Sequence, residues 1–178
     1  MKPLAPICLV ILLVFPQLAP ADPKAADPFK ALELIRPSRA QAAKEFTVPT
    51  PDGKSLKLAD YKGKVVFLNF WATWCPPCRE EMPAMERLYR RYKEKGLVVV
   101  ALSVDAEGAP VVIPFVKEHH FSFPLGLDPK MAVAEKYGVR ALPSSFLIDR
   151  KGQLAALALG PRQWDEKPAH SLIELLLK

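Results

Sequence analysis

Two long apolar runs stand out in the chain, and helical spacing of apolar residues follows the first. Residues 64–72 and 97–105 are almost continuously apolar, which is typical of strands buried on both faces of a sheet. Asn69 is the polar residue inside the first run. After this run, four apolar residues recur at three- and four-residue steps and predict the buried face of a helix. They are Met82, Met85, Tyr89 and Tyr92.

The rest of the pattern completes an alternation of helices and strands. A short helix is expected within residues 27–35, and two short strands are expected around a Pro-Asp-Gly turn within residues 44–58. Further elements are helices at 113–121 and 128–138, a hairpin at 144–160, and a last helix after Asp165 with an apolar stripe of Leu172, Leu175 and Leu176. This order predicts an α/β fold in which helices flank both faces of a central mixed sheet.

The N-terminus has the pattern of an export signal. Lys2 precedes an apolar run at residues 7–15, and Ala-Pro-Ala at residues 19–21 fits a cleavage site. This run has nine residues, whereas a membrane-spanning helix needs roughly 20. An uncleaved anchor stays an alternative, because no charge lies between residues 3 and 21. The predicted organisation is a signal peptide or anchor at 1–21, an N-terminal extension at 22–43, and one domain at 44–178 that folds outside the cytoplasm, for example in a periplasm.

Composition and charge exclude little beyond a nucleic-acid-binding role. The chain has 178 residues, half of them apolar, and a formal net charge of +6. The densest basic run, at residues 87–96, alternates with Leu88, Tyr89 and Tyr92 at helical spacing. This pattern indicates a solvated helix face, and no recognisable RNA or DNA motif accompanies it.

The cysteines carry the most specific chemistry. Removal of the signal peptide would take away Cys8 and leave Cys75 and Cys78, in the segment Trp-Cys-Pro-Pro-Cys. A Cys-x-x-Cys pair beside a strand–helix pattern is a redox signature. A helix N-terminus favours the thiolate of Cys75, and Cys78 would lie one turn further, shielded by the apolar face. We therefore expect Cys75 to attack a substrate disulfide and Cys78 to resolve the mixed disulfide.

Other uses of the cysteine pair are weaker. A disulfide that closes so short a loop constrains the unfolded chain little, which disfavours a structural role. Structural zinc sites need four ligands, and the histidines lack ligand spacing relative to the pair. The histidines are His119, His120 and His170. We expect no metal site, although a copper site completed by an outside ligand stays open.

The prolines between the cysteines bear on the direction of electron transfer. Pro76 and Pro77 cannot donate backbone hydrogen bonds, so fewer donors face the Cys75 sulfur. A less stabilised thiolate makes the reduced form less favoured and the pair more reducing. The sequence therefore predicts a reductase.

Two carboxylates follow the cysteines, and helical phase separates them. Glu81 falls near the buried face of the predicted helix, and Glu80 points to the opposite side. A half-buried carboxylate has a raised pKa and can transfer protons near neutrality, which makes Glu81 the expected proton carrier. Pro143, just before a predicted strand, is a candidate for a cis X-Pro bond or for ordinary punctuation at the strand entry.

These segments resemble the TlpA-like and ResA-like thiol-disulfide oxidoreductases of the thioredoxin superfamily. Residues 63–83 are similar to the active-site block of these proteins, residues 138–154 to their second block, and residues 46–64 to their N-terminal hairpin. The resemblance covers about residues 44–160. It implies a thioredoxin-like fold with an N-terminal hairpin extension and catalytic roles for Cys75, Cys78 and Glu81.

The resemblance also implies a substrate-binding surface. Pro143 matches the family's cis-proline, and Leu142 before it would offer its backbone to an extended substrate segment. A proline there also disfavours metal binding by the cysteine pair. Trp74 and Pro76 complete the expected substrate-binding set. Thioredoxins proper carry a buried acid where this chain has Asn69, whereas the TlpA-like and ResA-like families have a glutamate that matches Glu81.

The sequence therefore predicts an exported thiol-disulfide oxidoreductase with the Cys75–Cys78 disulfide as its redox group and no other cofactor. The expected partners are exported proteins with disulfides, such as apocytochrome c or a copper-site protein. A membrane thiol-disulfide transporter would supply electrons, because no nicotinamide or flavin motif is present. Two alternatives stay open. They are a copper- or haem-pathway chaperone that binds through the pair, and a peroxiredoxin-like peroxidase, which is disfavoured because its lone peroxidatic cysteine has a different local setting.

Overall fold

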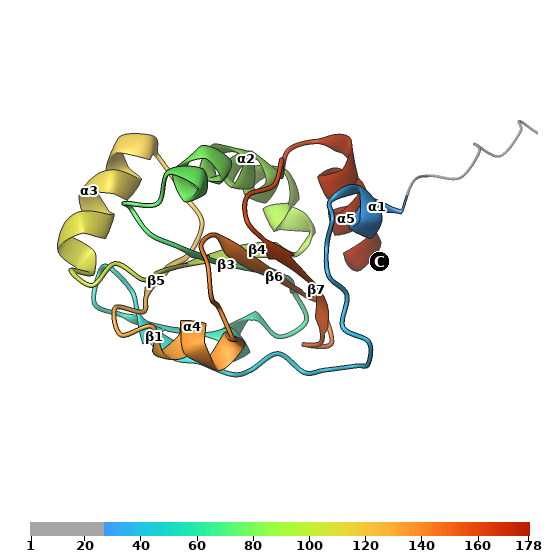
Figure 1. Cartoon of the computed structure of the whole chain (residues 1–178), viewed down its shortest axis with the longest axis horizontal. Coiled ribbons are helices and arrows are strands. Elements are labelled where there is room, and N and C mark those ends of the chain that lie inside the picture. The colour runs from blue at the N-terminus through green and yellow to red at the C-terminus, as the bar shows by residue number, and fades with distance from the viewer. Residues whose placement is uncertain (1–26) are drawn as a thin grey trace, which may run out of the picture.

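The central sheet has five strands in the order β5-β4-β3-β6-β7 (Figure 1). The structure is a computed structural model and describes residues 27–178, so the predictions for residues 1–26 lie outside the described residues. Strands β3 (Val65–Trp71), β4 (Leu97–Ser103) and β5 (Leu125–Leu127) run parallel. Strands β6 (Ser144–Ile148) and β7 (Leu154–Leu159) are antiparallel to their neighbours. The predicted mixed sheet is confirmed.

Both faces of the sheet are covered. In Figure 1, helices α2 (Pro76–Tyr92), α3 (Ala109–His119) and α5 (Lys167–Leu176) lie on one face. Helix α4 (Ala132–Tyr137) and the hairpin of β1 (Thr47–Pro49) and β2 (Ser55–Lys57) lie on the other. Short 3-10 helices span Leu58–Tyr61 and Lys93–Lys95. Every residue of β3 is buried, which explains the continuous apolar run that marked this strand in the sequence.

The N-terminal segment packs along the edge of the sheet. Helix α1 (Pro28–Ala31) is a single turn that begins at the Asp27 cap and is shorter than the predicted helix. Beyond it the chain turns at Glu33, where φ is 51°, and makes antiparallel bridges between Ile35 and Leu157 and between Ala42 and Gln153. Residues 27–43 therefore cover the edge of β7, while α1 lies beside α5 (Figure 1).

The helical faces follow the sequence pattern with one error. Met82, Met85 and Tyr92 are fully buried, as predicted. In α5, Leu172 is buried, but the prediction for Leu175 is wrong, since this side chain is 47% exposed. The buried face of α5 is centred on Ala169, Leu172 and Ile173, and Leu175 lies outside that arc. Within residues 27–178, no helix is both long and apolar enough to cross a membrane.

Candidate active site

The cysteine pair lies where β3 passes into α2, and it forms a disulfide. Cys75 is the N-cap of α2, and Cys78 is the third residue of the helix. Pro76 and Pro77 occupy the first helical positions, where proline fits because the N–H groups of a first turn have no partner inside the helix. Cys75 is 4% exposed and Cys78 is fully buried. Of the two sulfurs, only that of Cys75 is accessible to a partner.

A single helix amide serves the Cys75 sulfur. The backbone N–H of Cys78 donates to Cys75 Sγ at 3.3 Å, as in a side-chain N-cap. Pro76 and Pro77 have no N–H to add. The Cys75 sulfur therefore has one backbone donor from the first turn of α2, in line with the expectation from the sequence.

The surface around Cys75 is a mostly apolar cavity of about 440 Å³. Its lining includes Trp74, Cys75, Pro76, Pro77, Met131 and Leu142. Trp74 is 65% exposed, unusual for so large an apolar side chain. The Leu142–Pro143 peptide bond is cis, as one of the two expectations for this proline had it. The structure thus brings Trp74, Pro76 and Leu142 to one cavity with Cys75, while Pro143 is buried directly behind Leu142.

Glu81 lies one turn beyond Cys78 and is 3% exposed, whereas Glu80 is exposed. The Glu81 carboxylate accepts three hydrogen bonds. Asn69 Nδ2 donates to Oε1 at 2.9 Å, and Oε2 accepts from Trp164 Nε1 at 2.8 Å and from the backbone N–H of Arg162 at 3.1 Å. The prediction that helical phase buries Glu81 and exposes Glu80 is confirmed.

The surroundings of Glu81 raise its pKa. Burial disfavours the charged carboxylate and raises the pKa from 4.5 to about 7. The hydrogen bonds from Trp164, Arg162 and Asn69 favour the charged form and offset part of this rise. A carboxyl group with this pKa can exchange protons near neutral pH. The assignment of Glu81 to proton transfer stays a prediction.

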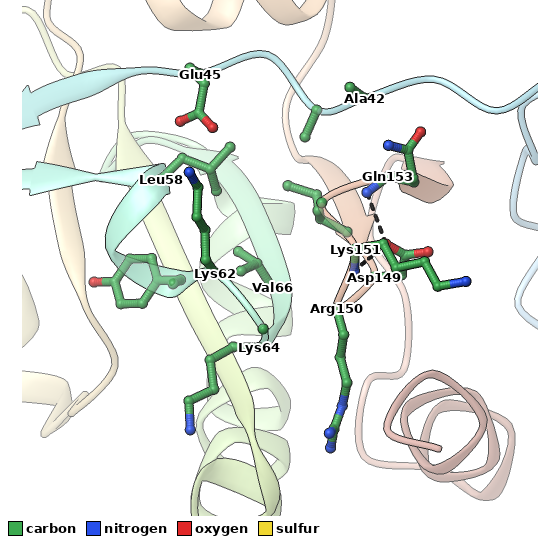
Figure 2. A pocket seen from close by; sticks show the side chains of 15 residues that line it. Ala42, Glu45, Leu58, Lys62, Lys64, Val66, Asp149, Arg150, Lys151 and Gln153 are labelled. Carbon is green, nitrogen blue, oxygen red and sulfur yellow. Dashed lines mark hydrogen bonds between the residues drawn. The ribbon is translucent and has the colours of Figure 1, made fainter.

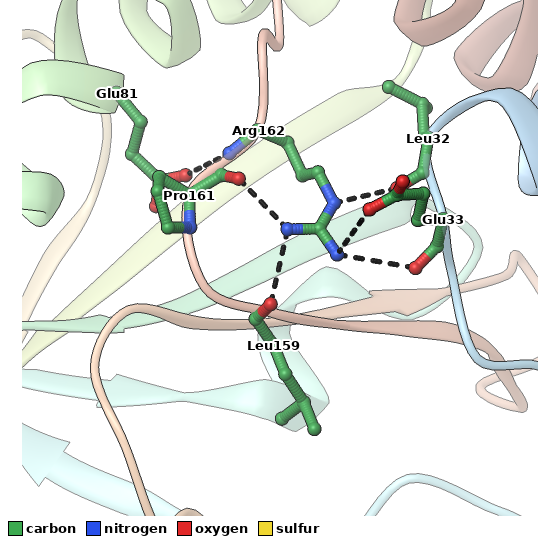
Figure 3. Close-up of polar contacts among 6 residues, drawn as sticks. All are labelled: Leu32, Glu33, Glu81, Leu159, Pro161 and Arg162. Carbon is green, nitrogen blue, oxygen red and sulfur yellow. Dashed lines mark hydrogen bonds and ion pairs between the residues drawn. The ribbon is translucent and has the colours of Figure 1, made fainter.

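Arg162 connects Glu81 to the N-terminal segment (Figure 3). Its guanidinium donates to the backbone oxygens of Leu32 at 2.7 Å and Glu33 at 3.2 Å, and also to those of Leu159 and Pro161. Its backbone N–H meets the Glu81 carboxylate from the other side. Arg162 therefore links the Glu81 carboxylate, through its backbone N–H, to the chain just after α1, through its guanidinium.

Sequence reasoning missed three of the residues that build this site. Trp164 and Arg162 follow β7 and carry no motif, so nothing in their local sequence indicates that they contact Glu81. Asp105 is the third, and its buried carboxylate accepts from the backbone N–H of Thr73 at 3.0 Å and from the Ser103 hydroxyl at 2.7 Å. This contact fixes the loop that leads to Cys75. An acid at the end of a parallel strand is the signal that could have found Asp105.

None of the three histidines lines the cavity beside Cys75. His119 stacks on Phe115 with ring centroids 4.3 Å apart, and His120 is exposed. His170 pairs with Asp165 at 3.2 Å. No group of three or more potential metal ligands occurs in the described part of the chain.

The second cavity, of about 340 Å³, lies between the β6–β7 turn and the segment before β3 (Figure 2). Four of its lining residues are basic: Lys62, Lys64, Arg150 and Lys151. They do not converge, since Lys62 extends to one side and Lys64 and Arg150 to the other (Figure 2). The Asp149 carboxylate accepts hydrogen bonds from the backbone N–H groups of Lys151 and Gln153. None of the predicted site residues lines this cavity.

The fold and the cysteine site define the class. The described domain has a thioredoxin-like fold with a disulfide-bonded Cys-x-x-Cys pair at the start of a helix. A family model described as the AhpC/TSA family matches residues 40–157, and the chain belongs to this family.

Named relatives agree with this class. The chain is 48% identical over 112 residues to "Thiol-disulfide oxidoreductase ResA" of Bacillus thuringiensis subsp. konkukian, covering 63% of this chain and 64% of that protein. It is 39% identical over 123 residues to the protein of the same name from Bacillus subtilis, covering 69% and 68% of the two chains. The chain thus spans slightly less than two thirds of the first relative.

Solved structures show the same fold. A putative thiol:disulfide interchange protein DsbE from Chlorobium tepidum is 36% identical, with a TM-score of 0.73, covering 79% of this chain and 99% of that one. StoA from Bacillus subtilis is 28% identical, with a TM-score of 0.61, covering 75% and 98% of the two chains. The predicted thioredoxin-like fold and the predicted resemblance to ResA are confirmed.

Proposed function

We propose that the protein is an exported reductase of protein disulfides. The observation that supports this direction most is the single backbone donor at Cys75, because the thiolate of a pair with few donors is weakly stabilised and its electrons are passed on readily. The names of the relatives support thiol-disulfide exchange but not its direction. Export is supported by the signal-like sequence at residues 1–21.

The reaction needs only the two cysteines and a proton carrier. In the reduced protein, the Cys75 thiolate attacks a substrate disulfide, forms a mixed disulfide and releases one substrate sulfur as a thiolate. The Cys78 thiol then loses its proton, attacks Cys75 Sγ and releases the second substrate sulfur. Two electrons pass to the substrate, and the Cys75–Cys78 disulfide is left. Glu81 accepts the Cys78 proton in this scheme.

The proposed partners follow from the same chemistry. The apolar cavity with exposed Trp74 suits an extended, apolar protein segment beside a disulfide. Exported proteins with reducible cysteine pairs, such as apocytochrome c or a copper-site protein, are the proposed substrates. A membrane thiol-disulfide transporter is proposed to reduce the protein again, and no cofactor beyond the disulfide takes part.

Trapping with Cys78→Ala tests the proposal. Without the resolving thiol, Cys75 should remain joined to its substrate in the extracytoplasmic fraction, and mass spectrometry of the adduct should identify the substrate. The matched control is Cys75→Ala, which leaves a thiol at the fully buried position 78 and should trap nothing. The absence of any adduct with Cys78→Ala, or stoichiometric Cu(I) binding without disulfide turnover, would contradict the reductase.

A further inference from the structure

Asn69 makes two contacts through one atom of its amide and leaves the other atom unused. Its Nδ2 lies 2.9 Å from Glu81 Oε1 and 2.9 Å from Ser145 Oγ. Asn69, Glu81 and Ser145 are 0%, 3% and 1% exposed. Asn69 Oδ1 is buried and has no hydrogen-bond partner among residues 27–178. Because an unpaired buried polar atom costs free energy, this orientation of the amide needs an explanation.

All three groups that contact the Glu81 carboxyl are donors, and the contact at Oε1 is the one that suits only the ionised form, because Oε2 of the acid can still accept as a carbonyl oxygen. An ionised carboxylate only accepts hydrogen bonds, and Asn69, Trp164 and Arg162 all donate to it. A protonated Glu81 would carry an O–H group that needs an acceptor. An indole N–H and a backbone N–H cannot accept. Of these three partners, only the side-chain amide of Asn69 contains an acceptor, namely the unused Oδ1.

A half turn of the amide exchanges donor for acceptor. The terminal torsion of asparagine is broad and roughly two-fold, so Oδ1 can take the place of Nδ2. From there Oδ1 can accept from protonated Glu81 and from the Ser145 hydroxyl, whose hydrogen is free to rotate. In the present orientation the Ser145 hydroxyl donates to no group in the described chain. Asn69 thus keeps its hydrogen bonds to Glu81 and Ser145 after the rotation, but as the acceptor and no longer as the donor.

We propose that Asn69 is a positioning residue whose amide turns over with the protonation of Glu81. It donates to the carboxylate and accepts from the carboxylic acid. Trp164 can only donate, and it binds the ionised carboxylate more strongly than the acid, whereas Asn69 can donate to the first and accept from the second. Glu81 can then take up and release a proton without its O–H group facing the N–H groups of the Asn69 amide. The use of this proton in catalysis rests on the proposed function. The titration of Glu81 itself can be followed in the oxidised protein, which carries out no reduction, so the turn of the Asn69 amide and the reductase activity are tested separately.

The charged groups near Glu81 would be the same in variants that change only Asn69 or Trp164. A cavity of about 330 Å³ borders Glu81, and its lining contains Glu33, Glu80, Glu166 and the cation Arg162. On the sheet side, Glu81 meets the uncharged Asn69, and the cysteines do not titrate while they form the disulfide. Substitutions at Asn69 and Trp164 leave this set of charges unchanged. Differences between the variants therefore report the hydrogen bonds.

The test compares Asn69→Leu with Trp164→Phe in the oxidised full chain, with the Glu81 pKa measured by carbon NMR of its carboxyl group. Trp164→Phe removes a donor that binds the ionised form more strongly than the protonated form and should raise the Glu81 pKa by about one to two units. Asn69→Leu removes a partner of both forms and should shift this pKa by less than about half a unit, while it lowers stability on both sides of the titration. An equal rise in both variants would overturn the proposal.

A second measurement uses the unaltered protein and stays decisive if a variant fails to fold. The Asn69 amide protons should show NMR contacts to the Ser145 side chain above the Glu81 pKa and lose them below it. Contacts that persist on both sides of the titration would mean that the amide does not turn, and the proposal would be wrong.

Discussion

Replacing Glu81 with Gln should remove a pH-dependent loss of stability. Burial raises the pKa of Glu81 from 4.5 to about 7, so between these values the folded protein holds a proton that the unfolded chain has released. The free energy of unfolding therefore falls as the pH rises through this window, and the fall is complete above the folded pKa. At about 1.4 kcal/mol per pKa unit, the loss approaches roughly 3 kcal/mol.

Glutamine is neutral at every pH and mimics the protonated acid. Its carbonyl can accept from Trp164 and Arg162, as Oε2 of Glu81 does. The stability of Glu81→Gln should therefore change with pH only through the other groups of the protein. Relative to the wild type, the variant should gain roughly 3 kcal/mol between acidic pH and a pH well above neutral.

Urea unfolding of the oxidised full chain measures this difference. Wild type and Glu81→Gln are unfolded over a pH series, and their free energies of unfolding are subtracted at each pH, so that all common titrations cancel. The control is Glu80→Gln, on the exposed side of the same helix, whose difference from the wild type should change little with pH. A difference between wild type and Glu81→Gln that is flat within about 0.5 kcal/mol over the series would refute a raised pKa at Glu81.

Three further substitutions test other parts of the site. Pro77→Ala restores an N–H in the first turn of α2, and this second donor at the Cys75 thiolate should raise the reduction potential by roughly 30 mV, measured by equilibration with glutathione. An unchanged potential would contradict the link between donors and potential. Trp74→Ala should slow the reduction of a protein disulfide several-fold but not that of a small aromatic disulfide, and equal losses would count against a substrate-binding role. Arg162→Ala should make residues 27–36 more sensitive to limited proteolysis, because the guanidinium holds their backbone; digestion at the wild-type rate would show that other contacts fix this segment.

The sheet and the cysteine site were predictable because their signals are local. Strands β3 and β4 are buried on both faces, so their sequences are apolar throughout. Cys75 and Cys78 are separated by three positions, and a helix start after a strand places them together. The path of residues 27–43 along β7 had no such signal, since two isolated bridges, one arginine and the burial of Phe29 and Leu32 against distant parts of the chain hold it. Leu175 was misplaced because a stripe of leucines does not reveal which edge of a helix faces the core.

Glu81 shows the boundary between local and distant signals. Helical phase indicated its burial, since burial depends on its own helix. Its partners Trp164 and Arg162 lie 83 and 81 positions further along the chain, and only the folded arrangement brings them to the carboxylate. The burial of the acid was therefore predictable, but not the hydrogen bonds that limit the rise of its pKa.

Asn69 and Glu81 are best understood as one feature. The sequence showed an amide on the strand at the place where thioredoxins carry an acid, and a glutamate on the helix, as two separate observations. The structure places Asn69 Nδ2 2.9 Å from Glu81 Oε1. An aspartate at position 69 would bring two carboxyl groups within hydrogen-bond distance, and one of them would have to stay protonated. Positions 69 and 81 together accommodate one buried acid, and with Glu81 in place the residue opposite it must be able to donate to a carboxylate.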